Sequence, residues 1–247
     1  MKTLKYLALI LLSAAVTQLT GCSLSFWSNS IGVKGSGHVI SEDRAVSGFD
    51  RVSLSGSGHL AIVQGDQEGL TIEADDNLLP LIKSEVSGGS LRLGPEDVNL
   101  RPSNTIQYRL RLKNLKELHL SGSLDADAPS LRTDGLVLSI SGSGRIQVRQ
   151  LDTGNLDVHV SGSGDIDVAG KADHQQVAIS GSGDYRAGGL ESQKIAVHIS
   201  GSGDATVWAH EALEAHVSGS GGIKFYGSPQ LDTHVSGSGS VRSLGAK

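Results

Sequence analysis

Cysteine, aromatic residues and positive charge are all scarce in this sequence. Cys22 is the only cysteine, so no disulfide can form within the chain and the fold must be held by its apolar core. Aromatic residues make up only 4% of the chain, which argues against a long aromatic-lined cleft. The formal net charge is −5, and a chain of this sign is a poor general partner for nucleic acid.

The sequence is instead rich in the tetrapeptide Ser-Gly-Ser-Gly. Its complete copies are Ser55–Gly58, Ser141–Gly144, Ser161–Gly164, Ser180–Gly183, Ser200–Gly203, Ser218–Gly221 and Ser236–Gly239, and a degenerate copy lies at Ser121–Leu124. From residue 121 onward, successive copies begin 18 to 20 residues apart. A fixed period of this length is typical of proteins built by stacking one small structural unit.

Alternating apolar and polar residues flank each copy. Around the third complete copy, Leu156, Val158 and Val160 share one face of an expected strand, and Ile166 and Val168 continue that face after the glycines. Each period therefore predicts a strand, a Gly-rich bend, a second strand and a polar turn. Stacked units of this kind predict an all-β, single-domain parallel β-helix, or solenoid, with coils of about 18–20 residues.

The glycines of the tetrapeptide are expected to form the bends. A sharp bend needs a positive φ angle or a close approach of two backbones, and glycine permits both. A phosphate-binding loop is a poor alternative, because no copy supplies the third glycine of a dinucleotide fingerprint or a following helix. The predicted structural bends are Gly56, Gly58, Gly142, Gly144, Gly162, Gly164, Gly181, Gly183, Gly201, Gly203, Gly219, Gly221, Gly237 and Gly239.

Signatures of common hydrolases are absent. The sequence contains no Gly-x-Ser-x-Gly element, so a nucleophile elbow has no support. The stretch His210–Glu214 lacks the second histidine of a zinc-protease helix, and we expect it in a turn between coils. Carbohydrate-cleaving β-helices usually display an aromatic and acidic cleft, and the repeats offer only Tyr185, Trp208, Phe225 and Tyr226 as aromatic residues.

The beginning of the chain is predicted to serve export and anchoring. Lys2 and Lys5 precede the apolar run Leu7–Val16, which is too short to span a bilayer. The run leads into Leu19–Cys22, which resembles the lipobox of bacterial lipoproteins, where the cysteine becomes the lipid-bearing first residue. The resemblance implies lipidation at Cys22.

This lipobox resemblance sets the expected domain boundaries. It implies a lipoprotein signal peptide at 1–21 and a lipidated tether at 22–43. By resemblance to Gram-negative lipoproteins, Ser23 implies sorting to the outer membrane. Stable anchoring requires more than one acyl chain.

Residues 44–247 are expected to fold as one domain with two different parts. Its first part does not follow the repeat period, although Thr105–Leu112 alternates strongly and Gly88-Gly89 predicts a hairpin turn. These irregular N-terminal coils are expected to cap the array, whose regular repeats begin at about residue 118. Only a short stretch follows Val235, which predicts a weak cap at the far end.

Several stretches of the first part resemble one known bacterial domain. They are Phe49–Gly58, Leu60–Gly65, Leu70–Leu78 and Leu79–Leu93, and together with the Ser-Gly-Ser-Gly copies they resemble the "putative auto-transporter adhesin head", or GIN, domain over roughly residues 44–243. The resemblance implies an exported β-helical domain, often on lipoproteins, without established catalytic activity. It carries over no catalytic residue.

Acidic residues recur at one position of the repeat and form a candidate metal site. Asp165, Asp184 and Asp204 each lie four residues after the first serine, so stacking brings like charges together, and a hard cation would relieve their repulsion. Arg145 holds the equivalent place one coil earlier and could neutralise Asp165. A solvated acidic stripe is the simpler interpretation, because Ca²⁺ requires about six to eight oxygen ligands.

Histidines recur at another position and form a second candidate metal site. His198, His216 and His234 each precede the first serine by two residues and are expected to point outward. Stacked imidazoles could bind Zn²⁺ or Cu²⁺. An exposed row of rings is the simpler interpretation, since the sequence fixes no carboxylates to support the imidazoles.

On these grounds we expect a non-enzymatic, lipid-anchored β-solenoid of the bacterial cell envelope that acts in adhesion or scaffolding through a repetitive polar surface. Its expected partners are the membrane, through Cys22, and a polymeric glycan or envelope protein, and no cofactor is expected. Two alternatives stay open, a polysaccharide-acting β-helix enzyme and a metal-binding periplasmic module. A convergent acid–base pair in a groove would favour the enzyme.

Overall fold

The structure, a computed structural model, describes residues 32–96 and 98–247. The predicted signal peptide, Cys22 and the first part of the predicted tether lie outside the described residues. In chain order the strands are β1 (Val33–Lys34), β2 (Val39–Arg44), β3 (Arg51–Gln64), β4 (Gly69–Asp75), β5 (Ile82–Ser87), β6 (Ser90–Pro95), β7 (Leu100–Arg101), β8 (Gln107–Leu112), β9 (Glu117–Ala128), β10 (Leu131–Gly142), β11 (Arg145–Gly162), β12 (Asp165–Gly181), β13 (Tyr185–Gly201), β14 (Asp204–Gly219), β15 (Gly222–Tyr226), β16 (Gln230–Gly237) and β17 (Ser240–Ser243). A short 3-10 helix, η1 (Leu79–Leu81), follows β4, and the described part of the chain contains no helix long and apolar enough to cross a membrane.

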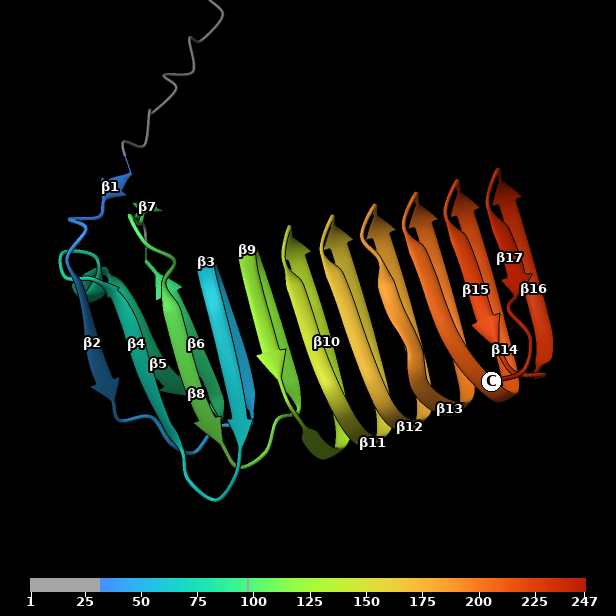
Figure 1. The fold of residues 1–247 in the computed structure, drawn as a ribbon, viewed down its shortest axis with the longest axis horizontal. Coiled ribbons are helices and arrows are strands. Elements are labelled where there is room, and N and C mark those ends of the chain that lie inside the picture. Colours follow the sequence, from blue (N-terminus) through green and yellow to red (C-terminus); the bar gives the residue numbers. More distant parts are fainter. Residues whose placement is uncertain (1–31, 97) are drawn as a thin grey trace, which may run out of the picture. The chain divides into compact units, whose positions relative to one another are not determined.

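The strands from β9 to β17 wind as a parallel solenoid. Each long strand pairs in parallel with the strand one coil earlier, so that Arg145 lies beside Asp165 and Ile166 beside Tyr185. In Figure 1 each long strand runs along one face, bends, and returns along the opposite face. This arrangement confirms the predicted parallel β-solenoid.

One detail of the repeat differs from the prediction. A polar turn was expected between the second strand of one repeat and the first strand of the next, but β11 and β12 continue through that stretch as single strands of 18 and 17 residues. In β12 the alternation of inward and outward side chains is interrupted at the bend, where Asp173 and His174 are both exposed. The pairing of β11 with β12 shifts register between Val148 and Leu151 and then resumes, so the backbone curves with only a local interruption of the pairing.

The core of the solenoid consists of aligned apolar columns that run through successive coils. One column contains Leu138, Val158, Val177, Val197 and Ala215, which are paired in register and are each at most 2% exposed. Burying each of the larger side chains stabilises the fold by about 1.5–3 kcal/mol. Because a column needs neighbours on both sides, each coil depends on the coils next to it.

The structure requires glycine at two positions of each repeat, for a different reason at each. Gly162 has a φ of +116°, and a Cβ there would lie 2.6 Å from the carbonyl oxygen of Gly142 in the preceding coil. Gly164 has no positive φ, but its Cβ would lie 2.5 Å from Cγ2 of Ile140. The same positive φ occurs at Gly142, Gly181, Gly201, Gly219 and Gly237, and the same overlap with the preceding coil at Gly144, Gly183, Gly203, Gly221 and Gly239.

The N-terminal part confirms the expected irregularity and forms its own arrangement. β3 continues the parallel array next to β9 and also pairs in parallel with β6 and β8. The pairs β2–β4, β4–β8 and β5–β6 are antiparallel. In the first tetrapeptide both Gly56 and Gly58 have positive φ angles. Antiparallel strands and a hairpin thus replace complete coils at this end.

The folded part begins earlier than the predicted boundary at residue 44. β2 includes Val39 to Asp43, which were assigned to the tether because the segment is short, polar and serine-rich. In the structure β2 pairs with β4, with Ser41 opposite Glu73. This segment is ordered by a long-range contact, which local sequence patterns do not predict. The buried carboxylate of Asp75 accepts hydrogen bonds from the backbone N–H groups of Gly37 (2.7 Å) and Ser103 (2.9 Å).

Candidate functional site

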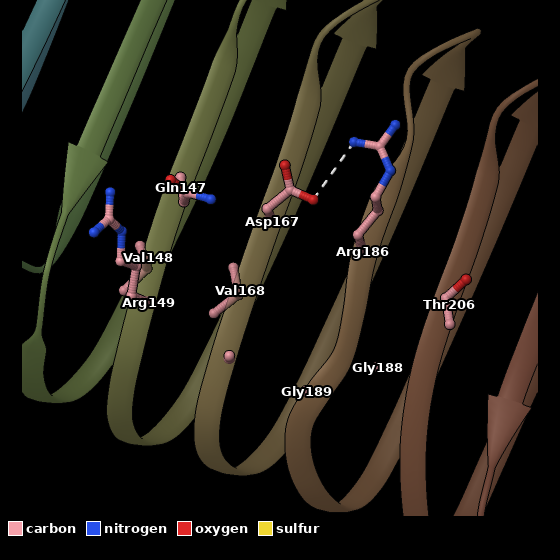
Figure 2. A pocket seen from close by; sticks show the side chains of 10 residues that line it. Gln147, Val148, Arg149, Asp167, Val168, Arg186, Gly188, Gly189 and Thr206 are labelled. Carbon is pink, nitrogen blue, oxygen red and sulfur yellow. Dashed lines mark hydrogen bonds and ion pairs between the residues drawn. The ribbon is translucent and has the colours of Figure 1, made fainter.

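The candidate site is an open recess on the face formed by the first half of each coil. It has a volume of about 520 Å³, which is within the usual range of ligand pockets. Figure 2 shows side chains from neighbouring coils arranged around it. The lining residues are Gln147, Val148, Arg149, Asp167, Val168, Ala169, Arg186, Gly188, Gly189 and Thr206.

A bulge in β13 creates the recess. Between the pairs Arg186–Thr206 and Glu191–Trp208, β13 has four residues where β14 has only Val207. The extra backbone includes Gly188 and Gly189, which carry no side chains, and Figure 2 shows β13 bending at this point. A bulge combined with missing side chains leaves a hollow in a surface that otherwise repeats evenly.

Charged side chains at the rim of the recess form a connected network. The guanidinium of Arg186 contacts Asp165 (3.1 Å), Asp167 (3.5 Å) and Asp184 (2.9 Å), and the Asp167 contact is drawn in Figure 2. Arg145 approaches Asp165 (3.5 Å) and Asp167 (3.6 Å) from the other side. Partial burial lowers the pKa of Arg186, but the hydrogen bond to Asp165 and the three carboxylates outweigh it and raise that pKa.

The Asp165, Asp184 and Asp204 column is built into the backbone pairing of the coils. Asp165 Oδ1 accepts from the backbone N–H of Asp184 (3.2 Å), and Asp184 Oδ1 accepts from that of Asp204 (3.1 Å). Asp204 Oδ1 in turn accepts from the N–H of Gly222 (2.8 Å). Arg145, as expected, and Arg186 supply positive charge along the column. The geometry gives these carboxylates a structural task at the start of each following strand.

The histidine column lies on the opposite face of the coils. His198, His216 and His234 are paired in register, and their ring centroids are 5.0 Å and 5.8 Å apart. The successive rings are tilted by 42° and 53°, so they pack against one another. Glu214 lies 3.4 Å from Nε2 of His216. In residues 32–96 and 98–247, no three His, Cys, Asp or Glu side chains converge in a manner suited to a metal ion.

Two aromatic side chains and a lysine adjoin the recess at Gly188. A Cβ on Gly188 would lie 3.2 Å from Cε2 of Tyr226, so the ring is packed against this glycine. The ammonium of Lys247 lies 4.7 Å from the Trp208 ring centroid and 5.3 Å from that of Tyr226. It also donates a hydrogen bond to the carbonyl of Gly188. A cation held over two half-buried rings is a favourable contact, and it covers their faces.

The stretch His210–Glu214 occupies a different place from the one predicted. It lies within β14 and not in a turn between coils. His210 Nε2 is 3.0 Å from Glu191 Oε1, and its ring packs against Trp208 at 5.4 Å. The alternation of the strand is interrupted here, because His210 and Glu211 are both exposed while Leu213 is buried.

Comparison with known proteins decides the family. The family described as "Putative auto-transporter adhesin, head GIN domain" matches residues 48–229. The chain belongs to this family. None of the curated proteins matches it. The family places this GIN domain among adhesin-like domains of the cell envelope or surface.

Solved structures share the fold of this GIN domain. A "putative adhesin" from Bacteroides fragilis NCTC 9343 is 26% identical, with a TM-score of 0.82 over 86% of this chain and 100% of its own. A "putative lipid binding protein" from Parabacteroides distasonis ATCC 8503 is also 26% identical, with a TM-score of 0.72 over 86% of this chain and 99% of its own. A "putative adhesin" from Parabacteroides merdae ATCC 43184, 22% identical with a TM-score of 0.66 over 86% of this chain and 98% of its own, shows the fold alone.

Sequence reasoning missed a buried polar cluster beneath the recess of this GIN domain. The hydroxyl of Tyr185 donates to Gln175 Oε1 (2.7 Å), and Gln175 Nε2 donates to Ser192 Oγ (2.6 Å). All three side chains are buried, and burial raises the pKa of the Tyr185 phenol. The place of Gln175 in the repeat could have indicated its burial, because the equivalent residues of the adjacent coils are Leu156 and Ile195.

Proposed function

We propose that this protein is a lipid-anchored, non-enzymatic adhesin of the bacterial outer membrane that binds a polymeric glycan through the recess and the rows beside it. The observation that carries the proposal is the recess itself, an open hollow lined by the polar side chains of Gln147, Arg149, Asp167, Arg186 and Thr206. A sugar ring presents hydroxyl groups at its edge and C–H groups on its faces. Charged and hydroxyl side chains bind these hydroxyl groups.

The chemistry of the recess supports binding over hydrolysis. Cleavage of a glycosidic bond normally requires two carboxyl groups, one acting as an acid and the other as a base or nucleophile. Asp167 is the only carboxylate among the described lining residues, and it is within 3.6 Å of Arg145 and 3.5 Å of Arg186. A single ionised carboxylate in the recess can accept hydrogen bonds from hydroxyl groups, but it lacks the second carboxyl group that cleavage requires.

The repeated surface fits an extended partner. Columns of equivalent residues recur at the spacing of paired strands, about 4.8 Å. A polymer can therefore contact several coils at once, and weak contacts at each coil add up. The recess would fix one unit of the polymer, and the neighbouring rows would hold the units on either side.

Membrane attachment is the second half of the proposal. It rests on the likeness of Leu19–Cys22 to the lipobox, on the apolar run before it, and on the absence of a long apolar helix from residues 32–96 and 98–247. We expect Cys22→Ser to release the protein from membranes. If the variant still sediments with membranes after a salt wash, the lipid anchor is wrong.

Glycan binding is tested with the purified full chain in detergent, applied to a glycan array singly and clustered on beads. We expect weak binding that strengthens on clustering and falls several-fold in Arg186→Ala. Arg132→Ala is the control, because Arg132 is also an ion-paired surface arginine, with Asp152 at 2.8 Å, but lies outside the recess. Release of free sugar would show an enzyme, and no binding by the clustered protein would refute glycan recognition.

A further inference from the structure

The C-terminal coil exposes a strand edge together with core residues. Within the described residues, β16 pairs only with β14 and β17 only with β15, so the outer edge of each strand has free backbone groups. All residues of β16 are exposed. Leu231 and Val235 are 47% and 42% exposed, yet they continue the buried columns of Leu213 and Val217. They are apolar because they belong to the core, and they are exposed because no described coil follows.

The last described residues leave this edge open. Leu244 donates its backbone N–H to the carbonyl of Phe225 (2.7 Å), and Lys247 reaches Trp208 two coils earlier. Residues 244–247 therefore run back along the side of the solenoid, and Figure 1 shows the chain ending against earlier coils. A free strand edge with apolar side chains is a template for pairing with another strand.

The sequence of β16 is complementary to itself in the antiparallel direction. If two copies of β16 pair about a two-fold axis at Thr233, Leu231 lies opposite Val235 and Asp232 lies opposite His234 of the second copy. The apolar pair falls on the inward face and the polar pair on the outward face, since side chains alternate along a strand. Asp232 has no ion pair within the described residues, and an imidazole N–H of His234 can donate to its carboxylate.

We propose that a second copy of this chain occupies the edge, so that two solenoids join end to end through antiparallel pairing of β16 centred on Thr233. The interface is isologous, with each contact made twice, and it closes at two copies. The opposite end of the sheet does not offer the same match. Its edge strand β2 carries Glu42, Asp43 and Arg44, and stacking onto it would continue into fibres.

This dimer is expected to be weak in solution. One coil end from each copy forms a small interface, below the area of stable dimers. A shared membrane surface would raise the effective concentration of the two copies. The pairing itself depends neither on glycan binding nor on the lipid at Cys22, so its test is separate from that of the proposed function.

The register gives a sharp cross-linking test. In an antiparallel pair, opposite Cα atoms are about 4.5–5.5 Å apart, which is within reach of a disulfide. We therefore expect Thr233→Cys in the purified full chain to form a disulfide-linked dimer under mild oxidation. Asp232→Cys should not, because its counterpart lies two residues along the partner strand, at roughly 8 Å. The wild-type chain is the control, because any dimer that it forms under the same oxidation arises from Cys22 alone.

Two further variants separate a specific interface from chance collision. Glu214→Cys lies in the same column as Asp232 one coil earlier, is exposed, and should not cross-link. Adding Leu231→Lys to Thr233→Cys should reduce the cross-linked fraction at least about ten-fold, because it buries a charge opposite Val235. Circular dichroism of each variant checks that the fold is intact.

The results that would overturn the proposal are distinct. They are no dimer from Thr233→Cys, equal dimer from Glu214→Cys, or sedimentation of the full chain as growing assemblies beyond two copies. Should Thr233→Cys fail to fold, mixing Leu231→Cys chains with Val235→Cys chains tests the same register. These chains should then form a mixed disulfide, and absence of this mixed disulfide would equally refute the pairing.

Discussion

The two ends of the same sheet solve the problem of a terminal strand differently. At the N-terminal end, antiparallel strands, a hairpin and the buried Asp75 close the array through contacts between residues far apart in the chain. From β9 onward, each strand pairs with the strands of the coils before and after it, and β16 of the last coil is exposed along its whole length. The comparison teaches that stability in this protein is either concentrated in a few long-range contacts or spread over many equivalent ones. The N-terminal part should therefore not survive the deletion of its paired strands, whereas the regular array should tolerate the loss of a whole coil.

Deleting 20 residues from each part should give the largest contrast. Removal of residues 145–164 takes out one coil, because Arg145 is paired with Asp165 and Gly144 can join Asp165 in register. We expect this variant to fold, since each coil contacts mainly its neighbours. Removal of 69–88 deletes β4, η1 and β5, on which β2, β6 and β8 depend, and should prevent folding. Circular dichroism and urea melts distinguish the two, and an unfolded coil deletion would contradict the comparison.

The largest effect of a single substitution is expected inside the regular array. Gly162→Val forces a branched side chain into a positive φ and toward the Gly142 carbonyl 2.6 Å from its Cβ. We expect a loss of about 3 kcal/mol or more in the free energy of unfolding. Gly135→Ala is the control, because a Cβ there meets nothing within 4 Å and needs no positive φ. Equal stability of the two variants would refute the explanation of the bend.

A smaller loss is expected when the long-range contact at the N-terminal end is removed. Asp75→Ala leaves the N–H groups of Gly37 and Ser103 without their acceptor. A hydrogen bond to a charged group contributes about 1.5–3 kcal/mol, so we expect the loss of both to decrease stability by roughly 2–4 kcal/mol in urea melts. The exposed Asp43, which accepts from Thr71 at 2.6 Å, is the control, and Asp43→Ala should change stability little. A neutral Asp75→Ala would show that this end does not rely on the contact.

The smallest effect is expected at the equivalent contact of the regular array. Asp184→Asn keeps an oxygen that accepts from the Asp204 N–H and loses only a half-exposed ion pair with Arg186. We expect a change within about 0.5 kcal/mol. Asp184→Ala, which also loses the hydrogen bond, should cost about 1 kcal/mol. A rise in melting temperature with calcium in wild type, but not in Asp184→Asn, would instead identify the column as a cation site.

Local alternation explains why the regular array could be predicted from the sequence. Val158, Val177 and Val197 stand at equal places in repeats whose period is visible, so their alignment in one buried column follows directly. The bulge at Gly188-Gly189 could not be predicted, because it depends on a difference in length between two adjacent strands. A sequence pattern indicates how the side chains of one strand are oriented, whereas the recess depends on how two adjacent strands of different length pair.

The contacts of residues whose partners are distant in the chain could not be predicted from the sequence either. Gln175 suggests an exposed position, and only the positions of Tyr185 and Ser192 explain its burial. Arg186 was not counted as a partner for the acidic column, because its contacts with Asp165 and Asp184 arise across coils. β2 was missed for the same reason, since its pairing depends on β4. The sequence therefore indicated the repeating scaffold well and the departures from repetition poorly.

The parallel register of the coils has a mechanical consequence. Hydrogen bonds between strands lie across the strands, so those of the solenoid point along its axis. Tension between the two ends of the array would therefore break the hydrogen bonds between coils one coil at a time, starting from an end. Each released coil of about 19 residues would add roughly 60 Å of slack chain. We expect force spectroscopy to show evenly spaced increases in extension of about this length. Under load the domain would then lengthen stepwise and would not unfold all at once.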